Sequence, residues 1–112
     1  MVLAAAIAKP EAEFPEITLL VRIKGNWYTV LVDYGTLRNY IRPEIVNTLR
    51  LPWNNKTRPY QVDSIEGHPF LYEDGWVRRE TDHLLFSTAN TEMKASFDLV
   101  IFGTIDLILK KP

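Results

Sequence analysis

Cysteine is absent from this chain of 112 residues. Its absence excludes disulfide bonds, thiolate nucleophiles and cysteine-ligated metal sites. It also fits a reducing compartment, so we expect an intracellular protein of the cytoplasm or the nucleus. Histidine is scarce: His68 and His83 are too few for a histidine-rich metal site, and no short ligand spacing joins them to a carboxylate. We therefore expect no metal and no cofactor.

A surplus of basic residues is also missing. Thirteen Lys and Arg stand against fourteen Asp and Glu, which gives a formal net charge of −1. Nucleic acid and anionic membranes both attract a basic surplus, so the expected partner is a protein or a peptide. No apolar run approaches the roughly 18 residues that cross a bilayer. The short run at 2–8 has no basic residue before it, so we expect no secretory signal there.

Proline sets the first residues apart from the rest. Pro10 and Pro15 bracket a small acidic stretch, and the composition changes at Ile17. Because proline lacks an amide donor, residues 1–16 are predicted to form a leader or linker arm, with an edge strand added to a partner as the alternative. Residues 17–112 are then predicted to form one domain.

From Ile17 onward the pattern is typical of β structure. Apolar residues alternate up to Ile23, a Lys-Gly-Asn turn follows, and an aromatic and β-branched run ends at Asp33, which together predict a central hairpin. The near-continuous apolar run of the second strand predicts burial on both faces. One helix is expected at 43–49, where Pro43 suits the first turn. Further strands are expected at 58–63, 76–80, 83–87, 92–101 and 106–109.

The second strand ends in an Asp-x-Gly turn, Asp33 to Gly35. Aspartate commonly bonds the backbone of turns, so the tripeptide alone is weak evidence of catalysis. Its surroundings are more specific, because a series of motifs follows in order. They are Asn39–Val46, Leu49–Pro52, Gly75–Val77 with Glu80-Thr81, Ser96–Asp98 and Asp106–Leu109.

This series, over about residues 17–112, resembles the retropepsin-like aspartic protease domain of Ty3/gypsy-type retrotransposons. That family reads apolar-apolar-Asp-Ser/Thr-Gly-Ala, then Asn-Phe-Ile-x-Pro-Glu, a short helix and Leu-x-Leu-Pro. The resemblance implies a mostly β, retropepsin-like (acid protease) closed domain with one short helix, two copies of which enclose a peptide cleft. It implies that Asp33, one per chain, is catalytic, that Gly35 aims its amide at that carboxylate, and that residues 63–76 form a flap. Two such carboxylates share one proton, because like charge raises one pKa.

The departures from the family pattern gather in this loop. Tyr34 replaces the small hydroxyl residue that braces the paired loops. Thr36, Leu37 and Arg38 replace the usual alanine, threonine and glycine. A glycine-like positive φ at Arg38 would strain the backbone by about 1 kcal/mol. Lys110 replaces a glycine of the last strand, where its ammonium must reach solvent or pair with a carboxylate.

Three interpretations stay open, of which we favour the first because it explains both the preserved framework and the altered loop. It is a catalytically inactive domain that serves as a protein-interaction or assembly module. Its bulky loop would overpack the usual homodimer interface, which we expect not to form, while other self-association stays open. The second is a homodimeric aspartic endopeptidase that cleaves polyprotein-type peptides through paired Asp33 residues. The third is a relative of the fold with an unrelated role, or an engineered scaffold.

In the first interpretation the loop itself carries the binding, since exposed aromatic residues are good interface anchors. The expected interaction residues are Tyr34, Thr36, Leu37, Arg38 and Tyr40.

Overall fold

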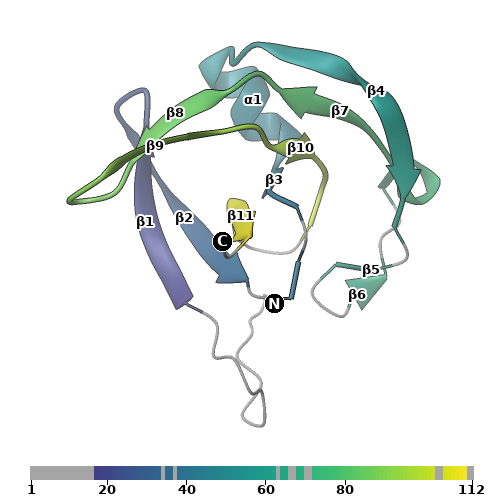
Figure 1. The fold of residues 1–112 in the computed structure, drawn as a ribbon, viewed down its shortest axis with the longest axis horizontal. Helices are drawn as coiled ribbons and strands as arrows, with labels where there is room; N and C mark the ends of the chain where they lie inside the picture. Colours follow the sequence, from purple (N-terminus) through teal and green to yellow (C-terminus); the bar gives the residue numbers. More distant parts are fainter. Residues whose placement is uncertain are drawn as a thin grey trace, which may run out of the picture.

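A computed structural model describes residues 17–33, 35–36, 38–62, 64–65, 68–69, 72–102 and 105–110. The expected leader arm, residues 1–16, lies outside the described residues. Within them the protein is mostly β with one short helix, and its sheet curls around the strand at its centre (Figure 1). The coarse prediction of a mostly β domain is confirmed.

The predicted hairpin is present and lies within the large sheet. β1 (Ile17–Ile23) pairs antiparallel with β2 (Asn26–Asp33), from Ile17 opposite Val32 to Ile23 opposite Asn26. Lys24 and Gly25 form the turn with φ angles of 49° and 83°. Positive φ at both central positions is the geometry that matches the twist of hairpin strands, and glycine adopts it without strain.

Nine strands form the large sheet in the order β4-β7-β10-β3-β11-β2-β1-β8-β9, and β5 pairs with β6 separately. The bounds are β3 (Tyr40–Ile41), β4 (Trp53–Gln61), β5 (Ser64–Ile65), β6 (His68–Pro69), β7 (Trp76–Thr81), β8 (Leu84–Ser87), β9 (Glu92–Ala95), β10 (Asp98–Leu99) and β11 (Leu107–Lys110), with a 3-10 helix η1 at Tyr72–Gly75.

One predicted strand is wrong. Residues 92–101 were expected to form a single strand, but the strand ends at Ala95 and a second one begins at Asp98. β9 pairs with β8, whereas β10 pairs with β3 and β7. Phe97 lies at the break and is buried, and it exchanges backbone and side-chain hydrogen bonds with Thr81. This tertiary contact overrides an alternation that by itself favours one continuous strand.

The strand expected at 58–63 instead begins at Trp53 and ends at Gln61. Its pairing with β7 shifts register between Asn55 and Tyr60. β4 is an edge strand whose side chains are mostly exposed, so its sequence carries no apolar alternation.

The predicted helix is confirmed. α1 spans Pro43–Leu49, with Pro43 in its first turn and Ile45 and Val46 buried. It ends at Arg50, whose φ of 53° and ψ of 46° are left-handed. Within the described ranges no helix has the length and apolarity needed to cross a membrane.

The second strand of the hairpin joins two parts of the core. Val30 and Val32 pack in one cluster with α1 and β8, whereas Leu31 packs in a second with Tyr40, Val77, Val100 and Ile108. Successive side chains of a strand point to opposite faces, so β2 is covered on both sides as its apolar run predicts.

Phe97 gives a direct test of this core. It is 1% exposed, and its ring meets Phe86 edge-on with centroids 5.6 Å apart. We expect Phe97→Ala to lower the free energy of unfolding by about 3–5 kcal/mol, because it leaves a cavity and removes the ring contact. Urea denaturation measures the change.

The matched control is Ile101→Ala, since the Ile101 side chain is 52% exposed. Its effect should stay within about 0.5–1 kcal/mol. Equal losses in the two variants would contradict this placement of the core.

Candidate functional site

Three strand ends converge where β2 stops. β11 runs parallel to β2 with Lys110 beside Asp33, and antiparallel to β3, so that the residues before Tyr40 reach the same end. β1 starts there too, because Ile17 pairs with Val32. We call this region the Asp33 end of the sheet, made up of Ile17, Asp33, Gly35, Thr36, Arg38, Asn39 and Lys110.

Asp33 bonds to its own turn. The Gly35 backbone N–H donates to Asp33 Oδ1 over 2.8 Å, and Asp33 is half-buried while Gly35 is exposed. Gly35 does not have a positive φ, and a Cβ placed on it would lie 3.4 Å from Asp33 Oδ1, an ordinary contact. The Gly35 backbone N–H therefore holds the Asp33 carboxylate in place, and an alanine at position 35 could make the same hydrogen bond.

Thr36 and Arg38 close the next part of the loop. The Arg38 N–H donates to Thr36 Oγ1 over 3.3 Å, and that hydroxyl donates to the Arg38 carbonyl over 3.2 Å. Arg38 does not adopt a positive φ, so the strain that a glycine-like conformation would impose is absent. Tyr34 and Leu37, two of the expected interaction residues, lie outside the described residues.

The guanidinium of Arg38 lies over the ring of Tyr60, with Cζ 4.1 Å from the ring centroid. A cation in this position is attracted by the negative face of the aromatic ring. Arg38 itself is exposed, so its charge is held in place while it stays accessible to a partner.

The expectation of an exposed Tyr40 is wrong. Tyr40 is 6% exposed and belongs to the second core cluster. It lies in β3, which is paired on both edges, with β10 on one side and β11 on the other. Of the expected interaction residues, the described ones that reach the surface are Thr36 and Arg38.

Asn39 is a residue of this end that sequence reasoning missed as a site residue. Its Nδ2 donates to the Ser96 carbonyl over 3.2 Å, and its Oδ1 accepts the Lys110 backbone N–H over 2.9 Å. Its carbonyl accepts the Asp98 N–H over 2.9 Å. Asn39 thus ties the loop to two strands, and its place at the start of the Asn39–Val46 motif is the signal that could have found it. Lys110 is exposed, so its ammonium reaches solvent.

A second cluster, which sequence reasoning did not predict, includes Tyr60, the residue on which Arg38 stacks. Lys56 Nζ is 2.9 Å from Asp98 Oδ1 and 2.9 Å from Glu80 Oε1. The Tyr60 hydroxyl donates to the other oxygen of Asp98. Asp98 is buried and Lys56 is nearly so, with side chains 8% and 9% exposed. A buried ammonium needs such partners, because leaving it unpaired costs several kcal/mol.

The pKa values of Tyr60 and Lys56 are both raised. Burial raises the pKa of Tyr60, and the hydrogen bond to Asp98 and the charge of Asp98 raise it further. Burial by itself lowers the pKa of Lys56, but its hydrogen bonds to Asp98 and Glu80 outweigh burial and leave the pKa raised. Both groups therefore hold their protons more tightly in the folded protein.

The segment expected to form a flap, residues 63–76, is described in part. β5 and β6 pair antiparallel, with Ser64 opposite Pro69 (Figure 1). In η1, Glu73 and Asp74 have φ angles of 48° and 56°. The Glu73 carboxylate pairs with Arg79, and with Arg78 over 3.5 Å. Residues 63, 66–67 and 70–71 lie outside the described residues.

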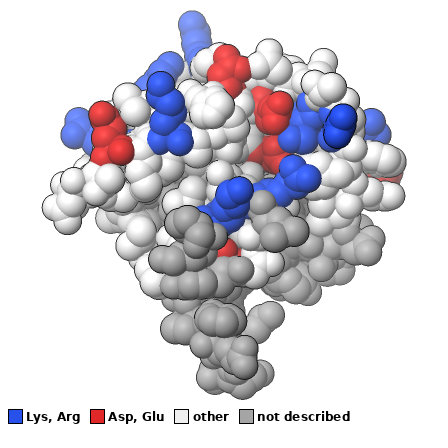
Figure 2. All heavy atoms as spheres, viewed as in Figure 1, with Lys and Arg blue, Asp and Glu red and all other residues white. Residues whose placement is uncertain are grey.

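Basic and acidic side chains are interspersed over the face shown in Figure 2, without a large area of one sign. His83 is exposed, on the loop before β8. Across the described ranges, no three His, Asp or Glu side chains gather in a way that could hold a metal ion.

No protein-family model matches this chain, and no curated protein matches it either.

The raised pKa values predict how stability depends on pH. A group whose pKa is higher in the folded state stabilises the fold fully below the pKa of the unfolded chain, about 10 for tyrosine and 10.4 for lysine, and loses that contribution as the pH rises. We expect the free energy of unfolding to fall above about pH 10, by at most about 1.4 kcal/mol per pH unit for each group. Urea denaturation between neutral and alkaline pH measures this slope.

Tyr60→Phe removes one titrating group, so its slope above pH 10 should be shallower than that of the wild type. Tyr28→Phe is the comparison, because burial and the charge of Asp106 raise the Tyr28 pKa as well, but Tyr28 lies outside the Lys56 cluster. The interpretation fails if Tyr60→Phe keeps the wild-type slope.

Proposed function

We propose that this chain is a retropepsin-like domain that does not cleave peptides and acts as a protein-interaction or assembly module through the Asp33 end of its sheet. The observation that carries the proposal is the composition of that end. Ile17 is 43% exposed there at the start of β1, and the exposed charges of Arg38 and Lys110 lie at the same end of the sheet. Protein interfaces typically combine an apolar anchor with charged residues around it.

The retropepsin-like part of the proposal is supported by where the family motifs lie. The Asp-x-Gly turn ends a strand covered on both faces, and β11, which carries the last motif, runs directly beside it. Asn39, from the second motif, bonds to β11 and to the residues before β10. Motifs distant in the sequence therefore meet around Asp33.

The absence of turnover follows from the loop residues. Paired carboxylates must be held within about 0.5 Å of their productive positions. Tyr34 and Leu37 are larger than the residues that the family uses there. Arg38 adds a cation to each loop, fixed over Tyr60, so two loops meeting at a two-fold axis would bring like charges together. Overpacking at such an interface typically costs about 1–3 kcal/mol per site.

One observation favours the second candidate, a homodimeric aspartic endopeptidase. The Gly35 N–H donates to Asp33 Oδ1, which is the contact that the resemblance implies for the catalytic loop. In that candidate two Asp33 carboxylates would share one proton. The ionised one would accept a proton from the attacking water, and the protonated one would support the carbonyl oxygen of the peptide.

A cleavage assay separates the two candidates. We expect concentrated wild-type protein to cleave no member of a diverse peptide library at pH 4–7 beyond the level of Asp33→Asn. Mass spectrometry of the library measures this. Cleavage that disappears in Asp33→Asn would establish the endopeptidase instead.

The same library, immobilised, tests binding. We expect the wild type to retain a subset of peptides and Arg38→Glu to lose them, because the change reverses an exposed charge of the proposed surface. Arg58→Glu is the matched control, since Arg58 is exposed on β4 and the charge change is the same. Equal binding by the two variants contradicts a role for the Asp33 end.

Sedimentation equilibrium tests the predicted lack of the usual homodimer. We expect a monomer at micromolar concentrations, and stronger self-association for Tyr34→Ser/Arg38→Gly, which restores small residues at the loop. A tight wild-type dimer that Arg38→Glu splits would show that the loops do meet at a two-fold axis.

A further inference from the structure

The outer face of four neighbouring strands forms a surface separate from the Asp33 end. Residues directly opposite each other in antiparallel strands point to the same side. Arg22 is opposite both Trp27 and Ser87, and Ser87 is opposite Glu92, so the four share one face. By the two-residue period of a strand, Leu20, Leu85 and Lys94 lie on it as well. We call it the outer face of β1, β2, β8 and β9.

Apolar exposure concentrates on this outer face. Among the described residues, four large apolar side chains are more than half exposed: Leu20 at 58%, Trp27 at 55%, Leu85 at 52% and Ile101 at 52%. The first three belong to the outer face. Exposed apolar side chains that include a tryptophan are typical of a surface that binds another molecule.

The cations of the face have few partners within the protein. Arg22 lies over the Trp27 ring at 6.0 Å, and Lys24 Nζ donates to the Leu49 carbonyl at the end of α1. In the part of the chain that the structure describes, neither Arg22 nor Lys94 forms an ion pair. With Glu92 as the acid among these residues, the face attracts a negatively charged ligand.

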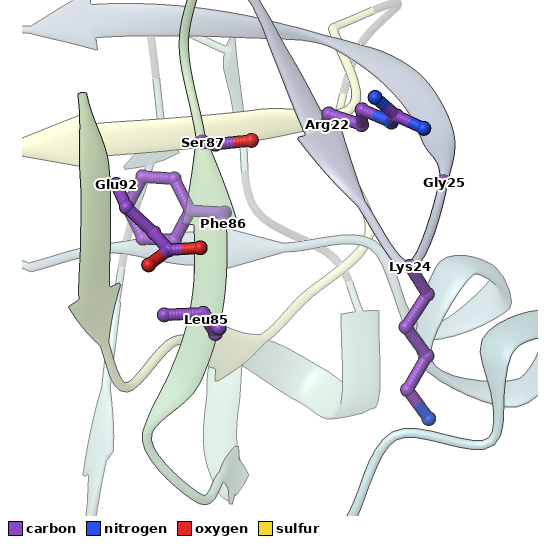
Figure 3. A pocket seen from close by; sticks show the side chains of 7 residues that line it. All are labelled: Arg22, Lys24, Gly25, Leu85, Phe86, Ser87 and Glu92. Carbon is purple, nitrogen blue, oxygen red and sulfur yellow. The ribbon is translucent and has the colours of Figure 1, made fainter. Parts of the chain in front are cut away.

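A hollow of about 230 Å³ opens where the Lys24-Gly25 turn diverges from β8. Figure 3 shows Arg22 and Ser87 on facing strands at its wall, with Leu85 further along β8 and Glu92 beyond it on β9. The Ser87 hydroxyl is directed toward β1, while the Arg22 side chain extends toward Gly25 (Figure 3). A guanidinium and a hydroxyl that line one hollow can both donate to a carboxylate that enters it, and Leu85 adds an apolar side chain to the lining.

We propose that the outer face of β1, β2, β8 and β9 binds an acidic peptide segment of a partner protein. A Glu or Asp side chain of the peptide enters the hollow and accepts hydrogen bonds from Arg22 and Ser87. An apolar neighbour packs on Trp27 and Leu20, and a second carboxylate pairs with Lys94. The alternation of cations with apolar side chains across the strands suits an extended peptide, whose own side chains alternate.

This surface does not depend on the function proposed for the Asp33 end. Arg22 lies five positions along β1 from Ile17, roughly 17 Å at the rise of a strand. Variants at one surface therefore leave the other intact, and the two proposals can fail separately.

Titration with a short synthetic peptide in which Glu alternates with Phe and Leu tests the proposal. In ¹H–¹⁵N spectra of the full chain, we expect the Trp27 indole N–H, assigned by its loss in Trp27→Phe, to shift on binding. Arg22→Glu should weaken binding roughly tenfold, and added salt should weaken wild-type binding. The Arg22→Glu variant should also bind the matching Lys peptide better than the wild type does.

Arg58→Glu again provides the control, because it makes the same charge change on a strand far along the sheet. It should bind the acidic peptide like the wild type, and unchanged dispersion of both spectra shows that each variant is folded. The proposal is overturned if the wild type does not bind, if the two variants lose affinity equally, or if binding leaves the Trp27 indole unshifted.

Discussion

The insertion of β11 between β2 and β3 is the constraint on which the rest of the structure depends. Its parallel pairing with β2 and antiparallel pairing with β3 join the hairpin to the strands on the other side of the sheet. Asp106 anchors its start, because Asp106 Oδ2 accepts both the N–H and the hydroxyl of Thr29, over 2.9 and 3.0 Å. Leu107 and Ile108 then enter the two core clusters from opposite faces of one strand. Without β11 the first cluster would lose Leu107 and the second would lose Ile108.

The same insertion sets the geometry of the Asp33 end. Because β11 keeps register with β2, Lys110 lies beside Asp33, and the Lys110 backbone N–H reaches Asn39. Asn39 in turn bonds to the Ser96 carbonyl, which lies between β9 and β10, and to the N–H of Asp98, the first residue of β10. Asn39, at the end of the loop after Asp33, is therefore held in place by hydrogen bonds to Ser96, Asp98 and Lys110.

Local patterns predict the hairpin and the helix, because Lys24-Gly25 and Pro43 carry signals that act within a few residues. They do not predict the break at Phe97, which exists because Thr81, distant in the chain, bonds its amide. They also misplace Tyr40, since the burial of a residue before a helix depends on which strands pair with it. Likewise Lys56 is one of six lysines in the sequence, and its low exposure follows only once β4, β7 and β10 lie side by side.

That buried cluster gives a physical reason for Arg38. Lys56 faces two carboxylates, Asp98 and Glu80, so with both ionised the cluster has a formal charge of −1. The Asp98 side chain is 8% exposed and that of Glu80 36%, and uncompensated charge costs more the less it is solvated. The Arg38 guanidinium, stacked on the Tyr60 ring whose hydroxyl bonds to Asp98, places a positive charge next to the cluster. The Arg38 side chain therefore stabilises the network of Lys56, Asp98 and Glu80 from its place on the Tyr60 ring.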